Sequence, residues 1–233
     1  MKIPGLRLTA PRKAIVASMA MTSMGAVIGG LALAADESRL PAHLSGLLND
    51  YTPPTSTSGP YEMHGKWSLH LNEERGAASF SADMTMEIAD FANPDPNHDP
   101  TKLGPHTHHI AVKDAVVHND LTDPINWKTA CPTFKPPVTR GFVVTGTAYV
   151  TGNGGNPPFG NPSAVTICVL GGMQNSSITA PQAFIDFSNF TLQFGTSSPA
   201  SSHFGTQAIN GVVSRCANPR NRESGDCRVA VVE

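Results

Sequence analysis

The stretch from Ala78 to Ile88 reads ASFSADMTMEI, and apolar residues alternate with polar ones along its whole length. Successive side chains of a β-strand point to opposite faces, so this period of two predicts a strand with one buried and one wet face. The stretch from Tyr61 to Asn72 alternates in the same way, and a polar turn at residues 73–76 separates the two. We therefore expect an antiparallel pair of strands whose apolar faces join one core.

The chain beyond this pair continues as short apolar runs that are broken by glycine, proline and asparagine. Further strands are predicted at residues 106–112, 115–118, 141–151, 163–170, 183–194 and 206–213. Seven or eight strands with almost no helical periodicity are typical of an all-β fold. We expect a single antiparallel β-barrel or β-sandwich domain over residues 61–233.

The N-terminal residues 1–35 have the features of a signal peptide. A basic start precedes an apolar span at residues 14–33, and Ala32-Leu33-Ala34 offers a cleavage site before Asp36. We expect a secreted or periplasmic protein without stable membrane insertion after cleavage. Residues 36–60 are predicted to form an N-terminal helix and linker, because Leu40, Leu44, Leu47 and Leu48 recur at helical spacing before a stretch rich in proline, serine and threonine.

The charge of the mature chain argues against a nucleic-acid partner. Removal of residues 1–35 leaves 12 Lys and Arg against 18 Asp and Glu, a net charge of about −6. A basic surface is the usual requirement for binding a phosphate backbone, so we expect no nucleic-acid binding. The sequence does not indicate an oligomeric state.

All four cysteines lie in the mature part of the chain. An even cysteine count in an exported protein predicts two disulfides, with three connectivities to choose from. We favour Cys216 with Cys227, because the segment between them is a polar loop, and this leaves Cys131 to pair with Cys168.

The histidine-rich stretch Pro105-His106-Thr107-His108-His109-Ile110-Ala111-Val112 carries the strongest functional signal. On a strand, His106 and His108 share a face with Ile110 and Val112, whereas His109 points the other way. Neutral imidazole is the commonest side-chain metal ligand. The His-x-His spacing therefore predicts a metal site, the alternative being a hydrogen-bonded pair at a sheet end.

A third ligand is needed, and His203 is the candidate because it lies just before a late strand. A solvent-exposed loop histidine is the alternative for this position. Copper is favoured over zinc and iron, because the set contains only imidazole and lies outside the cytoplasm. No residue is assigned a catalytic role, and the sequence contains neither a nucleophile elbow nor an ordered triad.

Other candidates have simpler explanations. His64 and His70 lie on the polar face of their strand and are expected to be exposed, and His98 lies in a long loop before the histidine-rich strand. Asp186 lies in an apolar run, where it is expected to be a ligand, a partner to a ligating histidine, or a residue facing water at a bulge.

The His-x-His pair on a β-strand is similar to the first motif of the cupins, which are also β-barrels. That motif has a glutamate a few residues after the pair, whereas here Asp114 is the first acid after His108, and glutamate is absent from Asn97 to Arg222. The resemblance covers three or four residues and implies a similar architecture, not membership.

The sequence thus favours a secreted β-barrel with a histidine-centred metal site, interpreted as a metal-dependent enzyme, an oxidoreductase before a hydrolase. One alternative is a non-enzymatic module that binds a small molecule or carbohydrate inside the barrel. Another is a structural protein of the cell surface.

Overall fold

The computed structural model describes residues 40–53, 60–88, 105–132, 140–153, 160–175, 183–217 and 228–231. The predicted signal peptide and His98 lie outside these residues. The described residues form nine strands and three single-turn helical segments. These are β1 (His43–Tyr51), β2 (Tyr61–Asn72), η1 (Glu73–Arg75), β3 (Ala77–Ile88), β4 (His106–His118), α1 (Trp127–Ala130), β5 (Arg140–Thr151), β6 (Ser163–Asn175), β7 (Ala183–Phe194), α2 (Ser201–Phe204), β8 (Ile209–Ala217) and β9 (Arg228–Val231).

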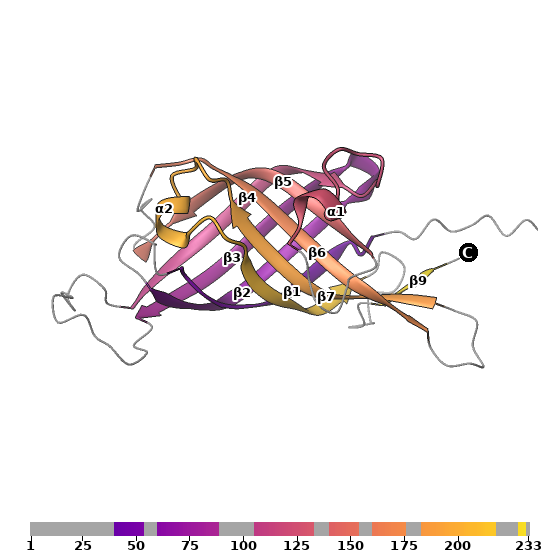
Figure 1. Cartoon of the computed structure of the whole chain (residues 1–233), viewed down its shortest axis with the longest axis horizontal. Coiled ribbons are helices and arrows are strands. Elements are labelled where there is room, and N and C mark those ends of the chain that lie inside the picture. The colour runs from indigo at the N-terminus through magenta and orange to yellow at the C-terminus, as the bar shows by residue number, and fades with distance from the viewer. Residues whose placement is uncertain are drawn as a thin grey trace, which may run out of the picture. The chain divides into compact units, whose positions relative to one another are not determined.

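Strands β1 to β8 form a closed antiparallel barrel in which each strand pairs with its neighbours in sequence (Figure 1). The barrel closes because β8 pairs back onto β1. The additional strand β9 pairs with the first residues of β7. The prediction of an all-β domain with seven or eight strands is confirmed, and the two alternatives resolve to a barrel. No helix among the described residues is long and apolar enough to cross a membrane.

The first barrel strand corrects one expectation from the sequence. The helix predicted within residues 36–60 is wrong, because His43–Tyr51 is strand β1 and pairs with β2 and β8. Leu44 and Leu48 are buried, but Leu47 is half exposed. Gly46 occupies the inward position between the two buried leucines and lies opposite Trp67 in the ladder. Gly46 therefore interrupts the apolar alternation of this strand, because the indole of Trp67 occupies the space that an inward side chain would fill.

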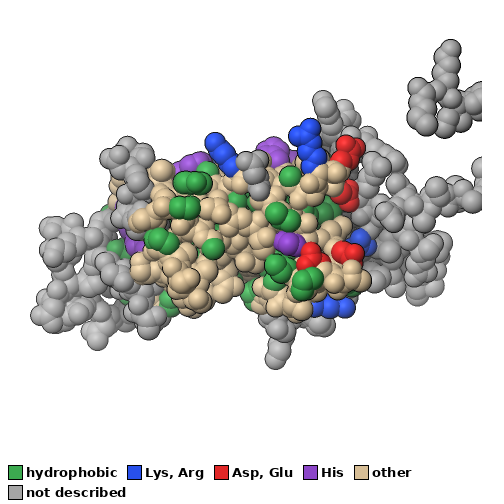
Figure 2. Space-filling view, turned by 90° about the horizontal axis from the view of Figure 1, so that it is seen from above, with side chains coloured by type: hydrophobic (Ala, Val, Ile, Leu, Met, Phe, Trp, Pro, Cys, Tyr) green, Lys and Arg blue, Asp and Glu red, His purple; other side chains and the backbone are tan. Residues whose placement is uncertain are grey.

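Alternation fills the barrel interior with apolar side chains. The inward residues of all eight barrel strands contribute to one hydrophobic cluster, which includes the fully buried Phe142, Phe190 and Phe194. An eight-stranded barrel is just wide enough for side chains to fill its interior. The outward residues are more polar, and Figure 2 shows acidic and basic side chains interspersed on one face, with hydrophobic side chains scattered among them.

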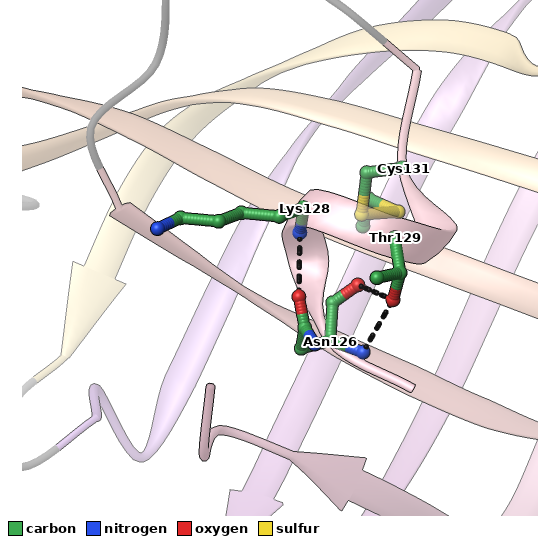
Figure 3. Close-up of a disulfide and its surroundings, with 5 residues drawn as sticks. Asn126, Lys128, Thr129 and Cys131 are labelled. Carbon is green, nitrogen blue, oxygen red and sulfur yellow. Dashed lines mark hydrogen bonds between the residues drawn. A yellow bond between two sulfur atoms is a disulfide. The ribbon is translucent and has the colours of Figure 1, made fainter. Parts of the chain in front are cut away.

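A smaller apolar cluster lies outside the barrel wall beneath α1. Val143, Cys168 and Leu170 alternate with inward residues of β5 and β6 and pack against Trp127 and other residues of the α1 segment. Figure 3 shows the disulfide here, which joins Cys131 to Cys168 as predicted. Cys216 is also disulfide-bonded, but Cys227 lies outside the described residues, so its pairing with Cys216 stays a prediction.

The antiparallel order brings one set of strand ends to the same end of the barrel. These are the C-terminal ends of β1, β3, β5 and β7 and the N-terminal ends of β2, β4, β6 and β8. Helix α2 belongs to the connection between β7 and β8 and so lies at this end, away from α1 (Figure 1). The first residues of β4, which contain the histidines, meet α2 here.

Candidate metal centre

The start of β4 presents its side chains as the sequence predicted. His108 is buried, and Ile110 and Val112 on the same face belong to the core. His106 is partly buried two residues before His108. His109 faces outward, where its Nδ1 lies 2.7 Å from Asp83 Oδ1 on neighbouring β3. The strand register assumed from the sequence is therefore correct.

Helix α2 brings His203 over this end of the barrel. Phe204 is fully buried and stacks on Phe194 with ring centroids 5.0 Å apart, so it anchors the helix in the core. Gly205 ends the helix with φ at +87°, a left-handed conformation that favours glycine. Its N–H donates to the carbonyl oxygen of Ser201. Because the next side chain is anchored inside, the ring of His203 is held at the barrel mouth beside β4.

Three imidazole nitrogens converge at this point. The Nε2 atom of His203 lies 3.2 Å from Nε2 of His106 and 3.1 Å from Nε2 of His108. One ligand atom from each residue lies within 4.8 Å of the other two. Two nitrogens bound to one tetrahedral zinc ion at about 2.0–2.1 Å would be about 3.3 Å apart. The two distances from the His203 nitrogen therefore suit a shared metal ion.

Hydrogen bonding alone accounts poorly for this arrangement. A ring nitrogen of neutral imidazole carries either one proton or one lone pair. Nε2 of His203 would have to use that single proton or lone pair toward both neighbours. A metal cation accepts a lone pair from all three nitrogens at once, so it matches the donor set better than a hydrogen-bond network does.

The environment keeps the two most buried rings neutral. Burial, together with the electrostatic influence of His203 and His106, lowers the pKa of His108 to about 3, against a smaller opposing effect of a backbone hydrogen bond with Thr151. Burial also lowers the pKa of His203 to about 4, with a contribution from His106. Neutral imidazole is the form that binds metal. Both rings are thus in the ligating form at neutral pH.

Tyr61 supports the rings from β2 and was not singled out by sequence reasoning. Its ring meets His106 edge-on at 4.9 Å between centroids and lies 5.7 Å from His203. Tyr61 is almost fully buried, its backbone N–H donates to Thr52 Oγ1, and burial raises the pKa of its hydroxyl. Nothing near Tyr61 in the sequence indicates this role, because β2 and β4 are neighbours of β3 and not of each other.

The remaining candidates lie away from this cluster. His64 and His70 are exposed, as expected. The backbone of Asp186 lies near the start of β7, where it pairs with Gly172 and Arg228, whereas His203 follows the other end of that strand. Its side chain is outside the described part of the structure, so its proposed roles stay predictions.

Comparisons with known proteins give no family for this chain. No family model matches it, and no curated protein or solved structure is significantly similar to it. The functional argument therefore rests on the geometry of the site.

Proposed function

We propose that this protein binds one transition metal ion through Nε2 of His106, His108 and His203. The observation that carries the proposal is the position of the His203 nitrogen, 3.2 and 3.1 Å from the other two. Copper is favoured over zinc and iron because the donors are all imidazole and copper lies at the top of the stability order for divalent ions. The disulfide fits an oxidising compartment such as the cell exterior or periplasm.

We further propose that the metal serves an enzyme, an oxidoreductase before a hydrolase. Three protein ligands leave a coordination position for water or a substrate, as in catalytic metal sites. His106 and His203 are only partly buried, so this position is reached from outside the barrel mouth. The bound ion would supply redox or Lewis-acid chemistry, and the chain supplies three neutral nitrogens in a fixed arrangement.

The filled interior favours this function over a ligand-binding barrel. The described inward side chains form one continuous hydrophobic cluster directly beneath the histidines. A small molecule or carbohydrate held inside the barrel would have to displace those side chains. A small ligand is therefore expected at the mouth, as a substrate bound next to the metal.

Metal binding is tested by titrating the purified protein with copper, zinc and iron and measuring stoichiometry by elemental analysis after dialysis. We expect one ion per chain, and loss of that ion in His203→Ala and in the His106→Ala/His108→Ala double variant. His109→Ala is the matched control, because His109 belongs to the same strand but faces outward. Loss of metal in the His109 variant with retention in the other two would refute the assignment, as would failure of all three metals to bind.

A further inference from the structure

A second constellation of hydrogen-bonded side chains lies on the outer wall of the barrel. The ring of His118, at the end of β4, has Nδ1 2.8 Å from Asp123 Oδ2 and Nε2 2.8 Å from Thr145 Oγ1. A carboxylate only accepts hydrogen bonds, so Nδ1 carries the ring proton and Nε2 accepts from the threonine hydroxyl. This is the order of groups in which a carboxylate orients a base that activates a hydroxyl nucleophile.

The carboxylate is held in place by its own segment. Hydrogen bonds from His118 and from the backbone N–H of Ile125 lower the pKa of Asp123, so it is ionised at neutral pH. The Asn126 amide donates to the carbonyl oxygen of Asp123 at 2.7 Å. Asn126 also accepts from the backbone N–H of Lys128 to cap α1, next to the disulfide of Cys131 (Figure 3). The disulfide thereby fixes the segment that carries Asp123 to the barrel wall.

The surroundings of the hydroxyl are apolar and exposed. Val116 lies directly across the ladder from Thr145, and its side chain is 52% exposed. Leu121 and Ile125, in the segment that carries Asp123, are 52% and 40% exposed. Exposed apolar side chains that gather beside polar groups are typical of a surface that contacts a ligand. The nearby carboxylates of Asp120 and Asp123 disfavour an anionic ligand.

The backbone next to Thr145 is irregular. The register between β4 and β5 shifts between Val112 and Val116, with one more residue on β4 than on β5. Such bulges are frequent beside active sites because they redirect side chains and free backbone groups from the ladder. The bulge thus lies beside the position where the Thr145 hydroxyl contacts the His118 and Asp123 pair.

We propose that Thr145, His118 and Asp123 form a second site that hydrolyses neutral carboxylic esters with a short apolar acyl group. Thr145 Oγ1 attacks the ester carbonyl carbon while its proton passes to His118 Nε2, which then protonates the departing alkoxide. A water molecule gives a proton to His118 and attacks the acyl-threonine. The acid leaves, the proton returns to Thr145, and one water is consumed per ester. Asp123 is a positioning residue that holds the ring and stabilises its charged form.

The test is hydrolysis of p-nitrophenyl butyrate by the purified full chain, with and without a chelator. We expect kcat/KM to fall by about 100-fold or more in Thr145→Ala and in Asp123→Asn, and to be retained in Thr145→Ser. Thr147→Ala is the matched control, because Thr147 is exposed on the same face of β5 two residues away. Mass spectrometry of quenched reactions should find the butyryl group on the peptide that contains Thr145, and thermal unfolding checks that each variant folds.

The outcomes separate this site from the metal centre. Hydrolysis that survives the chelator and the His106→Ala/His108→Ala double variant, but not Thr145→Ala, supports the proposal. Hydrolysis that disappears with the chelator and is unchanged in Thr145→Ala belongs to the metal centre and overturns it. Equal rates in Thr145→Ala and the unchanged protein, or no acyl group on Thr145, also overturn it. The three residues would then have only a structural role, holding residues 119–126 against the barrel.

Discussion

At the level of single residues, the buried histidines couple folding to pH. The pKa of His108 is lowered to about 3 and that of His203 to about 4, mainly by burial. In the unfolded chain both titrate near about 6.5. As the pH falls from about 6.5 toward 4, the unfolded chain binds protons that the folded protein excludes, so the free energy of unfolding decreases. The stability contributed by neutral rings is fully present above pH 6.5.

We therefore predict that the metal-free protein loses about 2 kcal/mol of stability between pH 7.5 and 5 for each of His108 and His203, because both folded-state pKa values lie below this range. Urea unfolding at several pH values measures this change. The variant His108→Gln cannot titrate at this position and should have a shallower pH dependence than the unchanged protein. An unchanged slope in His108→Gln would contradict the prediction.

At the level of elements, strand β1 illustrates where sequence patterns fail. Its inward positions are Leu44, Gly46 and Leu48, and the glycine removes the apolar signal at the centre of the strand. The four leucines that suggested a helix include Leu47, which faces outward and is half exposed. In β2 and β3, by contrast, apolar and polar residues alternate over most of the strand, so the period of two identified both strands directly. Predicting strand β1 would have required knowing that the Trp67 ring fills the space next to Gly46.

We predict that Gly46→Ala destabilises the barrel by about 2 kcal/mol or more, because an added methyl group has no free space. A Cβ atom there would collide with the carbonyl oxygen of Val212 and lie 2.8 Å from the Trp67 ring. Gly160→Ala is the matched control, since the nearest atom to its added carbon, on Pro199, is 3.4 Å away. Chemical unfolding of both variants measures the difference, and equal stabilities would contradict the packing argument.

At the level of the whole molecule, the candidate site was predictable in part. The shared face of His106 and His108 follows from alternation along one strand, and His203 was chosen because it precedes a late strand. The burial of His108 was not predictable from alternation, because the ring that packs against it belongs to Phe204 of α2, far along the chain. His118 and Thr145 were missed because their contact joins residues 27 positions apart.

The proposed metal should stabilise the folded protein, because the three candidate ligands come together in the folded barrel. A metal present at 100 times its dissociation constant adds about 2.7 kcal/mol, which raises the melting temperature of a chain of this size by roughly 5–10 °C. Calorimetry with and without the preferred metal measures the shift, and His203→Ala should abolish it. A shift that persists in this variant would place the metal elsewhere.

Helix α2 lies between the last two barrel strands, and its histidine meets two residues that precede it by 97 and 95 positions in the chain. The three nitrogens are therefore scattered until β4 and β8 are both in place, and a nascent or unfolded chain offers an ion no more than a single His-x-His pair. Under the proposed function, the metal would therefore be acquired only after the barrel has closed. The identity of that ion would then be set by the metals available in the compartment where the barrel closes, and for an exported chain not by those available where the chain is made.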